Sequence, residues 1–278
     1  MPIITLTTDF GAEDGYVAAM KGVILTLLPT ATLVDVSHAI APGAVRQAAY
    51  VLSTAAPFFP PDTVHVAVVD PGVGSARRAV AVGTTVGTFV GPDNGLLPAC
   101  LDFIIEQTDV SVANPQSPVL SLQAYVALTD PSLWRPAPSA TFHGRDIFAP
   151  VGAYLARGAT LERMGVAIED PVRLPPLATA MEAEGSWRGE VLHVDHFGNL
   201  ITTLTPASLS VPLRVGEATV AVGGQRIPLK RTFSDVPPGG LVAYIGSSGR
   251  VEVAVNGGDA AQALGTGVGA PISVSVES

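Results

Sequence analysis

Short β-rich runs alternate with helical stretches from the start of the chain to about residue 160, and this alternation constrains the fold more than any other feature. The stretch Glu13 to Leu28 repeats its apolar residues at helical spacing and is followed by Pro29. The same patterns predict strands over 3–10, 31–37, 63–70, 79–83 and 88–91, and helices over 44–56 and 145–157. We therefore expect an α/β N-terminal domain with a mostly parallel sheet.

The pattern changes near Pro175 and Pro176, where the helical signal ends and a linker is expected. Beyond it, short alternating strands are separated by Gly and Asn turns, and Gly223-Gly224 is a good hairpin turn. We predict an α/β domain over 1–174, a linker over 175–182 and a smaller all-β, barrel-like domain over 183–278.

The segment 104–140 is rich in Pro and Ser and has no clear period. We expect it to be loop with at most one short helix.

Composition argues against several classes of protein. The formal net charge is -9 and no cluster of Lys and Arg could neutralise phosphates, so we expect no nucleic-acid partner. No run of about 18 apolar residues occurs, and the start of the chain lacks a signal-peptide pattern, so we expect a cytoplasmic protein without a membrane partner. Cys100 is the only cysteine, which excludes an internal disulfide framework and a thiolate metal cage.

Two carboxylates lie at the ends of predicted strands. Asp70 ends "TVHVAVVD" and precedes the glycine-rich turn "PGVGSARR", and Asp9 ends the first strand in "TTDFG". A dinucleotide fingerprint would need a third glycine where Arg77 stands. Open α/β sheets bind ligands at the carboxyl ends of their strands, so we expect both carboxylates at one rim, around a small-molecule site. The alternative is that each aspartate only caps a turn or a helix.

Three further polar motifs have a structural and a functional interpretation. Asn94-Gly95 in "GPDNG" is foremost a tight turn that could also line a pocket. His143 lies in a loop before a helix, where it could handle a proton, position a group or only cap. His193, Asp195 and His196 do not share one strand face, so we expect no metal site.

Taken together, "TTDFG", "VVDPGVGSARR", "FVGPDNGLL", "FHGRDIFAP", "VDHFGNLITT" and "IGSSGRVEVAVN" closely resemble the S-adenosyl-L-methionine hydroxide adenosyltransferase family, relatives of fluorinase and chlorinase. The resemblance runs in order over nearly the whole chain. It implies hydrolysis of S-adenosyl-L-methionine to adenosine and L-methionine without a cofactor. It also implies a homotrimer that binds substrate between one subunit's N-terminal domain and a neighbour's C-terminal domain.

The family's catalytic Asp, Arg and His match Asp70, Arg77 and His143, and Arg77 rather than Arg78 matches by its distance from the aspartate. The halogenases have tyrosine at the position of Asp70, and this difference favours water as the nucleophile.

The resemblance also implies a set of substrate-binding residues. Asp9 and Asn94 would lie near the ribose or the methionine part, Asp195 and Asn199 would hold the amino-acid end, and Phe233 would stack on adenine. The stretch 247–257 would add contacts, through Ser247, Ser248, Glu252, Val255 and Gly257. Halogenases have an arginine about where Ser248 stands, which leaves open how the methionine carboxylate is held.

The expected reaction is attack of water on the ribose C5′ in line with the carbon–sulfur bond, which expels a neutral thioether. Asp70 either deprotonates the water or only orients it, and both roles stay open. The alternatives are a halide adenosyltransferase on the same fold, a calcium-dependent nucleoside hydrolase, and a non-catalytic adenosine or S-adenosylmethionine binding module.

Overall fold

The protein is described by a computed structural model that covers residues 1–109, 120–177, 179–183, 185–209 and 213–276. The chain divides into two units. Unit 1 comprises Met1–Ile105 and Pro115–Leu174, and unit 2 comprises Glu106–Asn114 and Pro175–Ser278. The division between Leu174 and Pro175 lies at the Pro pair, where a backbone lacking N–H groups cannot continue a regular element.

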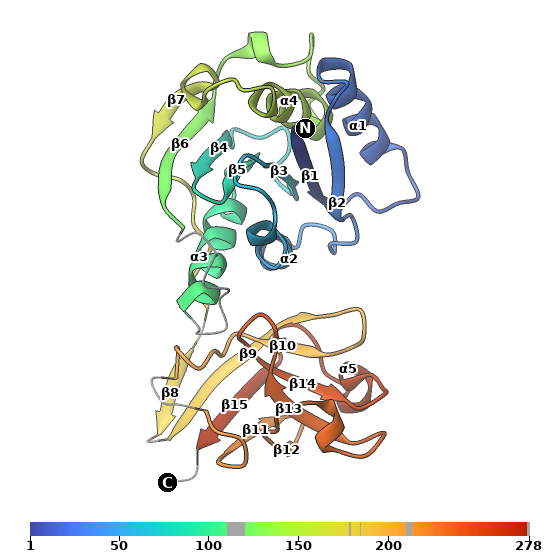
Figure 1. The fold of residues 1–278 in the computed structure, drawn as a ribbon, viewed down its shortest axis with the longest axis vertical. Coiled ribbons are helices and arrows are strands. Elements are labelled where there is room, and N and C mark those ends of the chain that lie inside the picture. Colours follow the sequence, from blue (N-terminus) through green and yellow to red (C-terminus); the bar gives the residue numbers. More distant parts are fainter. Residues whose placement is uncertain (110–119, 178, 184, 210–212, 277–278) are drawn as a thin grey trace. The chain divides into compact units, whose positions relative to one another are not determined.

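Unit 1 is built on a seven-stranded sheet in the order β2-β1-β3-β5-β4-β6-β7 (Figure 1). Its first four strands in that order are parallel, and the remaining pairings are antiparallel, so the sheet is mixed rather than mostly parallel. The strands are β1 Ile3–Thr8, β2 Thr32–Ser37, β3 Val64–Val68, β4 Ala79–Thr84, β5 Gly87–Pro92, β6 Leu122–Leu128 and β7 Gly165–Ile168.

Helices cover both faces of this sheet. Apolar side chains of β1 and β3 pack against α1 and α4 on one face, and α2 packs against β1 and β2. Alternate residues of β3 point to opposite faces. Val64 and Val66 therefore pack in the core under α1 and α4, whereas the buried His65 forms a hydrogen bond with Thr5 of β1. The helices are α1 Tyr16–Leu27, α2 Val45–Ser53, α3 Leu96–Asp109 and α4 Ala149–Ala156.

The prediction of loop over 104–140 is wrong for 104–109 and 122–128, whereas residues 129–140 are loop with one short helical turn at Pro131–Leu133. Helix α3 continues to Asp109, and β6 is an interior strand of the sheet, paired with β4 and β7. Residues 110–119 of the predicted loop lie outside the described residues.

Unit 2 contains an antiparallel sheet in the order β12-β11-β15-β9-β10-β14-β13, with β8 also paired to β9. A bridge between Leu229 and Ala243 links the two edges, so the sheet is nearly closed, like a barrel. The β11–β12 hairpin turns at Gly223 and Gly224, which both have positive φ, as a tight primed turn requires. The elements are β8 Ala180–Ala183, β9 Ser186–Val194, β10 Leu200–Thr202, β11 Ala218–Val222, β12 Gln225–Pro228, β13 Leu241–Ile245, β14 Val251–Val255, α5 Ala260–Leu264 and β15 Pro271–Val276.

The predicted linker, 175–182, includes the first residues of β8. Within the described residues, no helix combines the length and the apolar character needed to cross a membrane.

Candidate active site

A cavity of about 780 Å³ lies in unit 1, at the carboxyl ends of β1 and β3. The strand register pairs Thr8 with Val68, so the carboxylates that follow, Asp9 and Asp70, both reach the cavity wall. The other walls come from the start of α1, the turn at 42–43 and the segment 139–145. This is the edge where parallel strands present ligand sites.

The side chain of Arg77 binds the carboxylate of Asp70, and a glycine-rich turn connects the two residues. Arg77 Nε donates to both carboxylate oxygens at 3.0 Å, and Arg77 Nη2 donates to Oδ2. Gly74 has φ +79°, and a Cβ there would lie 2.5 Å from the carbonyl oxygen of Ala140, so the turn needs glycine. The turn thus returns the chain sharply and brings the guanidinium onto the carboxylate.

His143 joins this pair from a distant part of the chain. Arg77 Nη2 lies 2.7 Å from His143 Nδ1, and since a guanidinium has no acceptor atom, the imidazole accepts this hydrogen bond and carries its own proton on Nε2. Burial and the positive charge of Arg77 lower the pKa of His143, against smaller opposing effects of Asp70 and Asp146. His143 is therefore neutral at neutral pH.

Asp146 organises the loop that carries His143, and sequence analysis missed it. Its buried carboxylate accepts from Arg135 at 3.0 Å, from Arg145 at 2.7 and 2.8 Å and from the Ser139 N–H at 2.9 Å. Burial raises the pKa of Asp146, but these donors outweigh it and hold the pKa at about 2. The acidic residue in "GRD" at a helix start was the available signal. The segment 144–148 also forms a π-helical turn, a feature frequent at functional sites.

The turn "GPDNG" serves the scaffold around Asp70. Asn94 Nδ2 donates to the carbonyl oxygen of Val69 at 2.8 Å, and Asn94 Oδ1 accepts from the N–H of Leu96 at 3.2 Å. Asn94 thus holds the strand end next to Asp70 and caps the start of α3. Among the described residues, the wall of the cavity includes Asp9 but not Asn94.

Arg77 and Arg78 are neighbours with different partners. Arg78 Nε donates to the buried carboxylate of Asp93 at 2.7 Å, and Arg78 Nη1 pairs with Asp170 at 2.7 Å. Asp93 also accepts from the backbone N–H of Val172 at 2.8 Å. Arg78 therefore ties the segment near residue 170 to the turn at Asp93, away from Asp70.

Asp9 makes one side-chain hydrogen bond that we identify, from the N–H of Gly43 at 2.8 Å to Oδ2. It thereby joins the end of β1 to the turn before α2 and still lines the cavity.

Unit 2 holds a second polar cluster. Asp195 Oδ1 accepts from the N–H groups of Phe197 and Asn199, both at 2.9 Å, and Asn199 Nδ2 donates to Asp195 Oδ2 at 2.8 Å. A Cβ on Gly198 would lie 2.2 Å from Asp259 Cγ, so this loop also requires glycine. The two predicted binding residues are thus bonded to each other.

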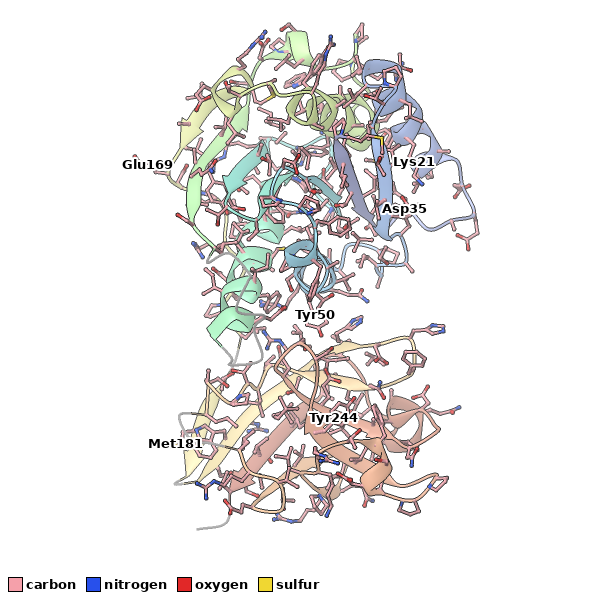
Figure 2. All side chains as sticks on the ribbon, in the orientation of Figure 1. Lys21, Asp35, Tyr50, Glu169, Met181 and Tyr244 are labelled. Carbon is pink, nitrogen blue, oxygen red and sulfur yellow. The ribbon has the colours of Figure 1, made fainter. Side chains whose placement is uncertain are left out.

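Glu252 lies on β14 and is almost fully buried. Tyr244, on β13 and labelled in Figure 2, donates its hydroxyl to Glu252 Oε2 at 2.8 Å, and its ring lies 4.9 Å from that of Phe233. Burial raises the pKa of Glu252, the Tyr244 and Ser248 hydrogen bonds oppose this, and the nearby Asp195 charge adds to the rise. A Cβ on Gly246 would come within 1.9 Å of Glu252 Oε1, so only glycine leaves room for the carboxylate.

The remaining predicted binding residues lie near the two ends of β14 in the chain. Ser247 and Ser248 are in the turn between β13 and β14, Val255 ends β14, and Gly257 follows with φ +74°. In the part of the chain that the structure describes, no group of three or more His, Cys, Asp or Glu side chains could hold a metal ion.

Comparison with known proteins identifies related chains. The family model "SAM hydroxide adenosyltransferase N-terminal domain" matches residues 4–165, and "SAM hydroxide adenosyltransferase C-terminal domain" matches residues 189–273. An (R)-S-adenosyl-L-methionine hydrolase of Salinispora arenicola is 46% identical over 99% of this chain and 98% of its own length. A fluorinase of Actinopolyspora mzabensis is 29% identical over 92% of this chain and 91% of its own length.

A solved structure resembles the whole chain. An uncharacterized conserved protein from Thermotoga maritima has a TM-score of 0.82 and 35% identity, and the match covers 98% of this chain and 99% of that one.

Proposed function

This chain belongs to the SAM hydroxide adenosyltransferase family, and from that membership we infer that it is an enzyme that hydrolyses S-adenosyl-L-methionine to adenosine and L-methionine. The observation that carries the inference is the 46% identity to a hydrolase over nearly the full length of both chains. The more distant fluorinase, at 29%, makes halide transfer the weaker alternative.

The reaction is a displacement at the ribose C5′. The sulfonium of the substrate leaves as a neutral thioether, so the leaving group needs no acid or metal, and we propose that no cofactor takes part. The enzyme must hold one water in line with the carbon–sulfur bond, at about 3 to 3.5 Å from the carbon. Each turnover releases one proton, because water supplies the hydroxyl group of adenosine.

We propose that Asp70, Arg77 and His143 hold this water. Asp70 accepts a hydrogen bond from it, so electron density rises at the attacking oxygen as the carbon–oxygen bond forms. Arg77 supports the assignment, because its guanidinium contacts both Asp70 and His143 and fixes their relative positions. Neutral His143 keeps a donor on Nε2, which can bind the same water.

We propose that the cluster in unit 2 binds the substrate's polar groups and adenine ring. Phe233 would stack on adenine, and the carboxylates of Asp195 and Glu252 would attract the α-ammonium group of the amino-acid end. Asp9, Asn199, Ser247, Ser248, Val255 and Gly257 complete the proposed contacts. Asn94 is proposed to act near the ribose through its hold on the strand end at Val69.

We further propose a cytoplasmic homotrimer without nucleic-acid or membrane partners, on the family resemblance and the absence of a basic cluster in a chain of net charge -9. Light scattering of the purified protein tests the trimer.

A chromatographic product assay tests the function. The protein is incubated with S-adenosyl-L-methionine, with and without chloride. Equal amounts of adenosine and L-methionine in both samples are the expected result. Formation of 5′-chloro-5′-deoxyadenosine would instead establish the halide reaction, free adenine would point to a nucleoside hydrolase, and binding without any product would leave only a binding module.

A further inference from the structure

Three aromatic rings form a corner of the cavity in unit 1. Phe10 follows β1, Tyr16 begins α1, and Phe142 directly precedes His143, and all three line the same cavity as Asp9 and Asp70. The ring centroids lie 5.9 Å apart for Phe10 and Tyr16, 5.8 Å for Phe10 and Phe142, and 5.3 Å for Tyr16 and Phe142. We call these three residues the aromatic corner.

The rings of the aromatic corner are steeply inclined to each other. The angles between their planes are 59°, 77° and 89°, so Phe142 meets both other rings edge to face and the three ring faces point in different directions. Aromatic faces carry partial negative charge and attract cations, and several faces around one point form the sites that proteins use for onium groups. The sulfonium is the onium group that the proposed substrate has and its products lack.

The reaction geometry sets where the sulfonium lies. In an in-line displacement, the sulfur leaves on the side of C5′ opposite to the water. Asp70, Arg77 and His143 hold the water in the proposed function, so the sulfur lies in the same cavity but away from the Asp70 carboxylate. The wall of this cavity also carries the aromatic corner and the Asp9 carboxylate, and both favour a positive charge.

We propose that the aromatic corner of Phe10, Tyr16 and Phe142 is the sulfonium subsite, and that Tyr16 is a residue that determines specificity for the charged sulfonium over a neutral thioether. The inference rests on the proposed function, since it takes S-adenosyl-L-methionine as the ligand. The aromatic corner would recognise the charge at sulfur, a role that we assign neither to the water-holding residues nor to the unit 2 cluster.

Tyr16 is the member of the corner best suited to substitution. It is 49% exposed and lies at the start of a helix, whereas Phe142 also stacks on the guanidinium of Arg145 at 4.9 Å. Phe10 packs close to Gly144 of the π-helical turn, where a Cβ would lie 3.3 Å from its ring. Changing Tyr16 therefore disturbs the fold least.

The charge at sulfur gives this role its own kinetic signature. The positive charge decreases as the carbon–sulfur bond breaks, so a cation–π contact stabilises the bound substrate at least as much as the transition state. Loss of the contact should therefore raise KM and leave kcat unchanged or slightly higher. A residue that only supported the fold of the cavity would lower kcat as well.

The test compares a charged and a neutral ligand. Binding of S-adenosyl-L-methionine and of S-adenosyl-L-homocysteine, a neutral thioether with the same adenosine and amino-acid groups, is measured by calorimetry on the full-length protein. An Asp70→Asn background slows turnover during the measurement. Tyr16→Leu should weaken binding of the sulfonium about three- to tenfold and leave the thioether within about twofold. Tyr16→Phe, which keeps the ring, should bind both ligands as the parent does.

A matched control is Phe58→Leu, which removes an 81% exposed aromatic ring outside the described wall of the cavity and should change neither affinity. Steady-state kinetics on variants that retain Asp70 repeat the comparison, as KM for the sulfonium against the inhibition constant of the thioether. Equal weakening of both ligands by Tyr16→Leu, or no weakening of either, would overturn the sulfonium subsite. Failure of the proposed function would show separately, as absence of adenosine and L-methionine with the unaltered protein.

Discussion

In unit 1 the carboxylate of Asp70 is paired with a cation, whereas in unit 2 the carboxylates of Asp195 and Glu252 are held by N–H and O–H donors. The guanidinium of Arg77 balances the charge of Asp70 and fixes its orientation. The hydrogen bonds in unit 2 orient two negative charges without neutralising them. The first arrangement suits a group that must hold a reacting water in place, and the second suits recognition of a positively charged ligand.

The two clusters also differ in their response to burial. Burial lowers the pKa of His143 and raises the pKa of Glu252, and both shifts favour the neutral form of the side chain. Neutral His143 keeps its acceptor for Arg77, whereas protonated Glu252 would lose the charge that attracts a cation. Together with the proposed roles, the comparison predicts that changes to Asp70, Arg77 and His143 act on kcat and that changes to the carboxylates of unit 2 act on KM.

The largest effect is expected for Asp70→Ala. Without the carboxylate that we propose to hold the water, turnover should fall about 10²- to 10⁴-fold, or roughly 3 to 5 kcal/mol of activation free energy. Adenosine binding, measured by calorimetry, should persist. Asp35→Ala, which removes an exposed carboxylate paired with Lys21 (Figure 2), is the control and should keep its activity. Near wild-type hydrolysis by Asp70→Ala would remove Asp70 from the mechanism.

Substitution of the neighbours Arg77 and Arg78 distinguishes an effect on catalysis from an effect on stability within unit 1. Arg77→Gln should lower kcat about 100-fold, because Asp70 and His143 lose the guanidinium that joins them. Arg78→Gln should leave kcat within about twofold but lower Tm, because Asp93 stays buried without its cation. Activity assays and thermal unfolding on both variants provide the check, and equal losses of kcat would show that the pairing around Asp70 is not specific.

A smaller effect, on KM, is expected in unit 2. Glu252→Gln keeps the size of the side chain and its hydrogen bond from Tyr244 but removes the charge, so KM should rise about tenfold with kcat little changed. Glu217→Gln, at a half-exposed carboxylate, is the matched control. If Glu252→Gln lowers kcat instead, the prediction that the unit 2 carboxylates act on KM is wrong.

The smallest effect is a change in pH dependence. The pKa of His143 lies below its ordinary value of 6.5, so the imidazole is neutral above pH 6.5 and protonates only as the pH falls below that value. Protonation removes the acceptor for Arg77 and sets two cations together, so kcat should fall on this acid side. His143→Gln offers an amide oxygen that does not titrate, and should be several-fold slower with a flatter acid limb.

Rate measurements between pH 4.5 and 7 on both proteins test the assignment, with His143→Ala as a second variant that lacks any acceptor. An unchanged rate in His143→Ala would show that His143 has only a structural role. An acid limb that persists unchanged in His143→Gln would assign the titration to another group.

Most strands and helices could be predicted from the sequence, because their periodic apolar faces survive in the fold. Helix α3 was missed because its first turn contains Pro98 and follows Asn94-Gly95, which is typical of a hairpin turn. Proline is tolerated in the first turn, where its missing N–H would have no partner, and Asn94 caps the helix instead. Strand β6 was missed because the segment 104–140 is rich in Pro and Ser and has no clear period. Its pairing with β4 and β7, which are distant in sequence, makes it a strand.

The candidate site was predictable in part. The end of an apolar strand placed Asp70, and the family resemblance pointed to Arg77 and His143. The aromatic corner and the ion pairs of Asp146 were not predictable, because Phe10, Tyr16 and Phe142 are ordinary apolar residues until the fold brings them to one cavity. Side-chain direction in a loop depends on contacts that local sequence does not specify.

By itself, the sequence determined that a carboxylate follows β3 and that a glycine-rich turn follows the carboxylate. It also determined a net charge of -9 and two regions with different periodicity. Only the tertiary structure decided that Arg77 turns to Asp70 while Arg78 turns to Asp93, and that His143 meets Arg77 across 66 residues. The physical reason is that strand register and the close approach of Gly74 to Ala140 set these directions, and both arise from contacts between distant segments.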